Sequence, residues 1–145
     1  MTIQDRVDLY KSMFSECNAL EPVSHIMAKG YKNKTPLGKL ELLRELATEL
    51  TEVYKVYIPT VTCWERDNNY VKGTKEIYLA EPDLEGFLHE WRHHLQNEAR
   101  DPNKILLLVE DDPQKDRKIL FKDTISTFYG EDDAVAWARM IMESI

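Results

Sequence analysis

The stretch LHEWRHHLQ (residues 88–96) holds three of the four histidines of this 145-residue chain, and it decides the fold that we expect. Successive residues of a helix lie about 100° apart around its axis. With that spacing, the apolar residues in and before this stretch share one face, which predicts the side that packs against the core: Leu84, Phe87, Leu88, Trp91 and Leu95. His89 and His93 fall one turn apart on the opposite side, with Glu90 beside them.

Residues 89–93 therefore have the spacing H-E-x-x-H on an exposed helix face. Two neutral imidazoles at positions i and i+4 can bind one Zn²⁺ at roughly 2.0–2.1 Å each, and the intervening glutamate can act as a general base toward a water molecule. We predict His89 and His93 as zinc ligands and Glu90 as the base. The five-residue pattern is short, and the alternative is a polar helix face with two solvated histidines. His94 and His25 are not expected to be ligands.

The third ligand is expected on the last helix, residues 131–145. Its apolar positions form one stripe at helical spacing: Ala134, Trp137, Ala138, Ile141, Met142 and Ile145. Glu131 falls inside this stripe, whereas Asp132 and Asp133 fall outside it, toward solvent. The helix dipole accounts for acids in a first turn, but a carboxylate on the buried face needs a positive partner. We therefore predict Glu131 as the third zinc ligand and keep Asp133 as the alternative.

The whole sequence predicts one α+β domain over residues 1–145. Helices are expected at residues 3–20, 37–54, 84–99 and 131–145, with Pro22 close to the end of the first. A strand that begins near Val56 and short strands at residues 70–71 and 76–80 predict a small, mostly antiparallel sheet. The apolar run 105–109 fits either a strand or a buried helical segment, residues 123–129 are equally ambiguous, and residues 110–116 predict an exposed connection.

Composition restricts the partners that we expect. The net charge is −7 and the basic residues are scattered, so neither nucleic acid nor an anionic membrane is a predicted partner. The sequence holds no apolar run of the roughly 18–20 residues that span a bilayer. The N-terminus does not resemble a secretory signal, and the two cysteines are far apart without a CxxC motif. These features predict a cytoplasmic location with reduced thiols.

The two motifs together resemble those of the ImmA/IrrE family of phage- and plasmid-associated metallopeptidases, which are minimal zincins. That family pairs an HExxH helix with a later helix of the pattern E-x-x-A-x-x-F-A-x-x-L-L, which supplies a glutamate ligand. Residues 131–142, EDDAVAWARMIM, match the second pattern with Trp137 in place of the Phe and Ile141-Met142 in place of the two leucines. The resemblance covers residues 37–145. One departure is Arg92, because the family has a small residue before the second histidine; we expect Arg92 to brace a carboxylate, narrow the cleft or lie in solvent.

The resemblance implies a zincin-like fold and a zinc-dependent metallopeptidase that hydrolyses a protein or peptide substrate. In such a fold the substrate would lie extended along the edge of the sheet, here the strand expected at residues 76–80. Two alternatives stay open. One is a catalytically inactive zincin-fold module with a binding or regulatory role. The other is an interaction protein whose acidic surface contacts a basic partner and whose histidines have no chemical role.

Overall fold

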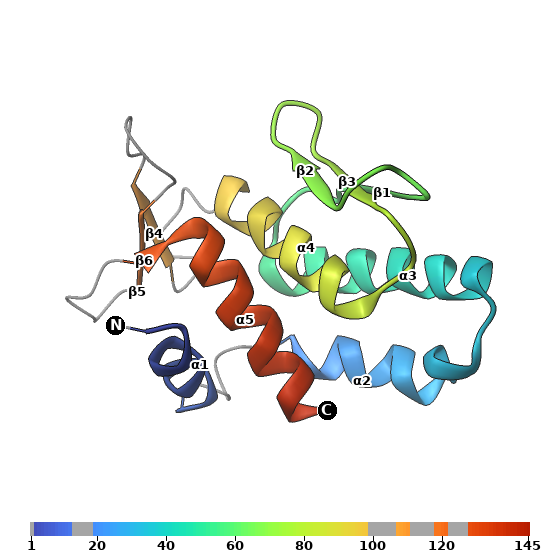
Figure 1. Cartoon of the computed structure of the whole chain (residues 1–145), viewed down its shortest axis with the longest axis horizontal. Coiled ribbons are helices and arrows are strands. Elements are labelled where there is room, and N and C mark those ends of the chain that lie inside the picture. The colour runs from blue at the N-terminus through green and yellow to red at the C-terminus, as the bar shows by residue number, and fades with distance from the viewer. Residues whose placement is uncertain (1, 13–18, 99–106, 111–117, 122–127) are drawn as a thin grey trace.

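The computed structural model describes residues 2–12, 19–98, 107–110, 118–121 and 128–145 (Figure 1). Within these ranges the chain is an α+β protein, as predicted, and it has five α-helices where four were expected. In chain order the elements are α1 (Ile3–Ser12), α2 (Leu20–Ala28), the short 3-10 helix η2 (Tyr31–Asn33), α3 (Pro36–Tyr54), β1 (Thr60–Cys63), β2 (Asn69–Val71), β3 (Glu76–Leu79), α4 (Leu84–Glu98), β4 (Leu107–Glu110), β5 (Lys118–Phe121), β6 (Phe128–Tyr129) and α5 (Gly130–Ser144).

The first sheet is mixed, with the strand order β1-β3-β2. β3 pairs in parallel with β1 and in antiparallel fashion with β2. β3 is therefore the central strand. The prediction that it forms the sheet edge is wrong, because β1 pairs with one side of β3 and β2 with the other. The outer strands of this sheet are β1 and β2.

A second, antiparallel sheet has the order β4-β5-β6. β4 shows that the ambiguous apolar run at residues 105–109 contains a strand from Leu107 onward. β5 had no counterpart among the predicted elements. The segments 111–116 and 123–127, on which we made predictions, lie outside the described residues.

Helix α3 forms where the sequence predicts it. Thr35 caps its N-terminus, because the Thr35 hydroxyl accepts a hydrogen bond from the Gly38 amide at 3.2 Å, and Pro36 occupies the first turn. The helix ends at Lys55, which adopts the left-handed conformation with φ 57°. Its buried face consists of Leu40, Leu42, Leu43, Leu46, Ala47, Leu50 and Thr51.

One helix was predicted over residues 3–20. The structure has α1 at Ile3–Ser12, residues 13–18 of that prediction lie outside the described residues, and Leu20 begins a second helix, α2. Pro22 was expected to terminate a helix, but it lies in the first turn of α2, where the missing N–H of proline has no intrahelical partner to lose.

Helix α4 lies in the middle of the molecule, between the first sheet and α5 (Figure 1). Its predicted core face is confirmed, because all five apolar residues named above are buried. Trp91 of α4 stacks on Trp137 of α5, with the ring centroids 5.7 Å apart. On its other flank α5 packs against α1. Because α5 is covered from two sides, its buried surface is wider than a single apolar stripe.

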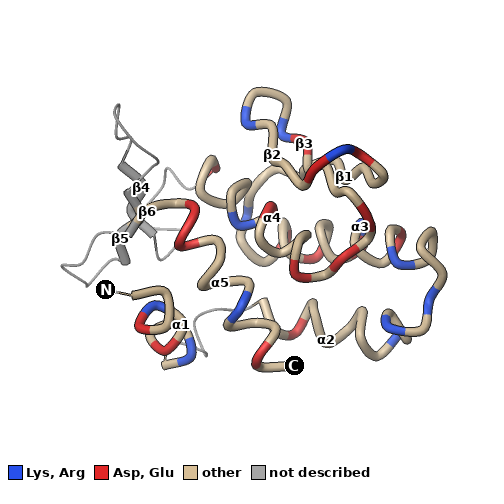
Figure 2. Tube along the Cα trace, viewed as in Figure 1, with Lys and Arg blue, Asp and Glu red and all other residues tan. Residues whose placement is uncertain are grey.

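Charged residues are distributed over the described trace without one dominant basic segment (Figure 2). Lysines and arginines occur on α1, between α2 and α3, around the β2–β3 connection and on α5. In the described ranges, every helix is too short or too polar to cross a membrane.

Candidate metal centre

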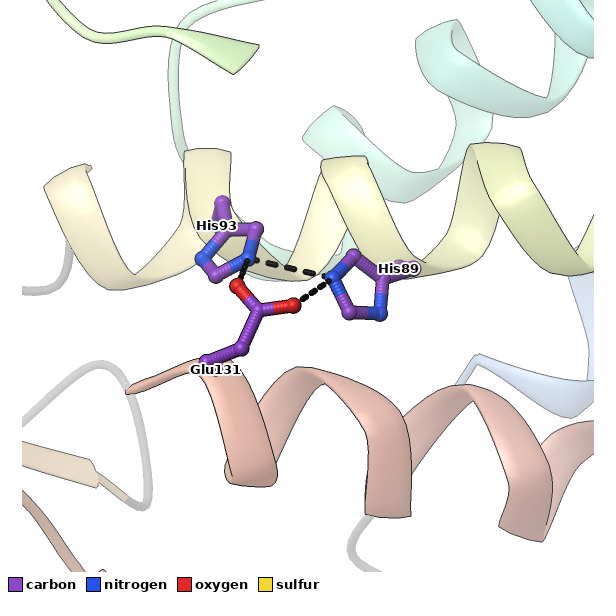
Figure 3. A group of neighbouring side chains, drawn as sticks. All are labelled: His89, His93 and Glu131. Atoms are coloured by element: carbon purple, nitrogen blue, oxygen red, sulfur yellow. Dashed lines mark hydrogen bonds and ion pairs between the residues drawn. The ribbon is translucent and has the colours of Figure 1, made fainter. Parts of the chain in front are cut away.

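The structure brings His89 and His93 of α4 together with Glu131 of α5 (Figure 3). His89 Nε2 lies 2.8 Å from Glu131 Oε1, and His93 Nε2 lies 3.0 Å from Glu131 Oε2. The two Nε2 atoms are 3.3 Å apart. One ligand atom from each residue thus falls within 4.8 Å of the other two. Two turns of one helix and the first turn of another supply the group.

This geometry fits a tetrahedral metal ion. Ligand atoms at roughly 2.0–2.1 Å from a tetrahedral zinc are about 3.3–3.4 Å from one another. The separation of the two histidine Nε2 atoms, 3.3 Å, agrees with that value, and the carboxylate oxygens are a few tenths of an ångström closer. Two imidazoles and one carboxylate are also the donor set of several catalytic zinc sites, which leave one position for water. The residues present therefore fit Zn²⁺.

The surroundings of His89 favour its uncharged form. Burial lowers the pKa of His89, and its proximity to His93 lowers it further, which favours the neutral ring that a metal requires. The His89 and His93 side chains are only 20% and 19% exposed, whereas Glu131 is 61% exposed. The centre therefore opens to solvent on the side of α5.

Glu90 lies on the wall of a cleft beside this centre. The cleft has a volume of about 340 Å³ and is lined by Asn68, Asn69, Tyr70, Lys72, Glu90, His93, Gln96, Asn97 and Glu131. Glu90 itself is buried, with 7% of its surface exposed. Desolvation, helped by the charge of Glu131, raises the pKa of Glu90 to about 7. A carboxylate with such a pKa can accept a proton and release it again near neutral pH.

A second hollow lies next to this cleft. It has a volume of about 370 Å³ and is lined by Asn68, Asp83, Glu85, Gly86, His89 and Glu90. Asn68 and Glu90 line both parts. Space for a ligand therefore extends to both sides of Glu90.

Asp133 does not face solvent as predicted. It is fully buried, and Arg92 Nε donates to Asp133 Oδ2 at 2.8 Å. Arg6 and Tyr10 of α1 also donate to Asp133. Burial alone would raise the pKa of Asp133, but the charge of Arg92 and the hydrogen bonds lower it to about 2. This carboxylate is thus engaged by two guanidinium groups rather than by the histidines.

The helix faces predicted for Glu131 and Asp133 were therefore wrong: Glu131 is exposed and Asp133 is buried. Glu131 nevertheless lies next to His89 and His93, as expected. Asp133 shares a second buried face of α5 with Ala136 and Met140, and α1 helps to cover that face. Glu131 lies in the first turn, where the helix surface is still open. Of the three expectations for Arg92, the structure shows the one in which it braces a carboxylate.

Gln96 is a site residue that the sequence analysis missed. It is 2% exposed, and its side-chain oxygen lies 3.0 Å from His93 Nδ1. Its side-chain nitrogen donates to the Gly130 carbonyl at 2.9 Å and to Asp133 Oδ2 at 3.0 Å. The signal available in the sequence was its position three residues after His93, which places the two side chains on neighbouring turns.

The other two histidines lie apart from the centre. His94 is buried; its Nδ1 is 2.8 Å from the Tyr70 hydroxyl and its Nε2 is 2.6 Å from the Tyr57 carbonyl. His25 lies on the surface of α2, 3.0 Å from Glu49. Both positions agree with the expectation that neither residue is a ligand.

Comparisons of the chain with protein-family models, with curated proteins and with solved structures gave no match.

Proposed function

We propose that this protein is a zinc-dependent peptidase. The observation that carries the proposal is the convergence of two histidine nitrogens and one carboxylate from two helices, with a buried glutamate on the wall of the adjoining cleft. His89, His93 and Glu131 would hold Zn²⁺. These residues and Glu90 are the elements of the zincin-like resemblance noted in the sequence.

Three groups of electron-rich atoms converge at this point. Where both imidazoles are neutral, their lone pairs and the Glu131 oxygens repel one another unless a proton or a cation lies between them. A divalent ion satisfies all three at once. The low pKa expected for a partly buried His89 beside His93 favours the cation over additional protons.

The metal and Glu90 would divide the chemistry of the hydrolysis. Bound Zn²⁺ supplies polarisation of the substrate carbonyl and acidifies a water molecule. Glu90 accepts the proton of the attacking water and delivers it to the leaving amine nitrogen. The burial of Glu90 supports this role, because it excludes bulk water and brings the pKa of Glu90 close to neutral.

The substrate is proposed to be an extended protein or peptide segment that lies beside β2. β2 is an outer strand, and Asn69 and Tyr70 on it line the same cleft as His93 and Glu131. The cleft wall is rich in amide side chains and holds Lys72, so polar substrate side chains fit it better than large apolar ones.

The test is zinc content followed by activity. Protein purified without a histidine tag is expected to hold close to one zinc ion per chain, and His89→Ala and His93→Ala are expected to lose it. With a mixture of unstructured peptides as substrate, Glu90→Gln is expected to keep zinc and lose cleavage. Zinc without any cleavage by the wild type would instead favour the inactive binding module. Wild-type protein that binds no zinc would remove the proposal.

A further inference from the structure

We propose that Gln96 is a positioning residue that selects which nitrogen of His93 carries the proton, and thereby prepares His93 Nε2 as a metal ligand. This inference rests on the proposed zinc site. It adds a residue outside the HExxH motif and the glutamate helix, and it connects the centre to the buried ion cluster between α1, α4 and α5.

The orientation of the Gln96 amide follows from its two partners on α5. The Gln96 side-chain nitrogen lies 2.9 Å from the Gly130 carbonyl oxygen and 3.0 Å from Asp133 Oδ2. A carbonyl and a carboxylate held by a guanidinium group can only accept hydrogen bonds. The NH₂ end of the amide must therefore face α5, because the reverse orientation would place an oxygen against two other oxygens.

The protonation of His93 follows from that orientation. The Gln96 side-chain oxygen lies 3.0 Å from His93 Nδ1 and can only accept. His93 Nδ1 must therefore carry a hydrogen, and in the neutral ring the lone pair is left on Nε2. Nε2 is the atom that lies 3.3 Å from His89 Nε2 and 3.0 Å from Glu131. The nitrogen that faces the centre is thus the one able to bind a metal.

The same contact fixes the ring in space. Gln96 is 2% exposed, and Arg92 holds its partner Asp133 at 2.8 Å, so the amide has little freedom to turn. A metal-binding histidine whose second nitrogen donates to a fixed acceptor loses less ring freedom on binding. Removal of such a partner typically weakens metal affinity by about 10- to 100-fold.

The experiment compares Gln96→Met with a matched control, Asn97→Leu. Methionine keeps the length of the side chain but removes both ends of the amide. Asn97 is the next residue on α4, and its amide donates to the Tyr70 hydroxyl and to the Lys72 carbonyl instead of meeting a proposed ligand. Zinc affinity is measured by competition with a chelator, and folding is checked by urea unfolding. Gln96→Met is expected to bind zinc about 10- to 100-fold more weakly, and Asn97→Leu is expected to bind it as the wild type does.

A second measurement reports the proton directly and needs no metal. Long-range ¹H–¹⁵N correlation spectra of metal-free protein at about pH 8.5, above the usual imidazole pKa of about 6.5, show which ring nitrogen of His93 is protonated. The wild type is expected to be protonated at Nδ1, and Gln96→Met is expected to lose that preference. Nδ1 protonation that stays unchanged in folded Gln96→Met would show that Gln96 does not select the protonated nitrogen of His93.

The outcomes separate this inference from the proposed function. A wild type that binds zinc but carries its His93 proton at Nε2 in the metal-free state overturns the inference and leaves the peptidase proposal intact. Unchanged zinc affinity in folded Gln96→Met does the same. If Gln96→Met does not fold, the wild-type spectrum still tests the inference, because a proton at Nε2 overturns it. A wild type without zinc affinity removes the proposed function, whatever the spectra show.

Discussion

Arg92 and Asp133 form a buried ion pair that crosses the contact between α4 and α5, with Arg92 Nε 2.8 Å from Asp133 Oδ2. Arg92 directly precedes His93, and Asp133 follows Glu131 by two residues. Because the guanidinium group and the carboxylate meet at one point, α4 and α5 cannot slide along each other without breaking the pair. The relative position of the histidines and Glu131 is therefore fixed by an interaction next to them.

Loss of the Asp133 carboxylate should destabilise the protein strongly. Asp133→Ala leaves the buried positive charges of Arg6 and Arg92 without the carboxylate that faces them, and breaking a buried ion pair on one side typically costs about 3–5 kcal/mol. The free energy of unfolding in urea measures the effect. Asp132→Asn changes a neighbouring, partly exposed acid and should stay within about 0.5 kcal/mol of the wild type. Equal effects of the two substitutions would contradict this account.

Zinc should stabilise the folded protein through Glu131. At a zinc concentration of about 100 times the dissociation constant, binding adds about 2.7 kcal/mol to the free energy of unfolding. If Glu131→Gln weakens binding about 100-fold, the same zinc concentration adds only about 0.4 kcal/mol. Urea unfolding with and without zinc checks both values. A Glu131→Gln protein that gains as much as the wild type would show that this carboxylate is not a ligand.

Gly86 should resist replacement by alanine, although alanine favours helices by about 1 kcal/mol. A Cβ atom at Gly86 would lie 2.7 Å from the side-chain nitrogen of Asn68, and that side chain is held because its oxygen accepts from the Ala80 amide at 2.8 Å. Gly86→Ala is therefore expected to gain less stability than the helix preference alone would give. In an Asn68→Ala background the same substitution should gain more stability than in the wild type, although Asp83 Oδ2 would still lie 3.1 Å from the added Cβ. Equal gains in both backgrounds would show that Asn68 yields without cost.

The sequence predicted the helices that have a single apolar face at helical spacing and pack that face against the core. α3 and α4 are of this kind, since leucine and aromatic residues recur on a single side and polar residues occupy the other. HExxH spacing likewise requires only that residues 89–93 be helical. These predictions involve neighbours along the chain and need no knowledge of tertiary contacts.

The predictions that failed involve contacts between distant segments. Asp133 is buried because α1 covers a second side of α5, and nothing within residues 131–145 indicates that cover. β3 is central because it pairs directly with β1, in parallel, although β2 lies between them in the sequence. Leu20 begins a helix instead of ending one, because Pro22 fits the start of a helix as well as its end.

Arg44 should stabilise the edge strand β1. Arg44 Nε and Nη2 both donate to the Val61 carbonyl, at 3.0 and 2.9 Å. A hydrogen bond from a charged group contributes about 1.5–3 kcal/mol, so Arg44→Ala is expected to lower the free energy of unfolding by a value in that range. Arg44→Lys can supply only one donor in this direction and should retain part of it. Arg66→Ala, at an arginine whose side chain is 97% exposed, is the control for the lost charge. If the two alanine variants lose the same stability, the contact with Val61 contributes nothing.

Because the Arg44 guanidinium group occupies the Val61 carbonyl, the two edge strands of the first sheet differ in their ability to pair with an added strand. A strand that approaches β1 meets the Val61 carbonyl, which already accepts a hydrogen bond from Arg44. In contrast, β2 lies next to the cleft lined by His93. Side chains of an added strand alternate between two faces, so a shift by one residue turns each of them over. In the proposed function, a substrate segment aligned with β2 would keep its side chains on the same faces only if it moved in steps of two residues, which would limit the amide bonds that it presents for cleavage.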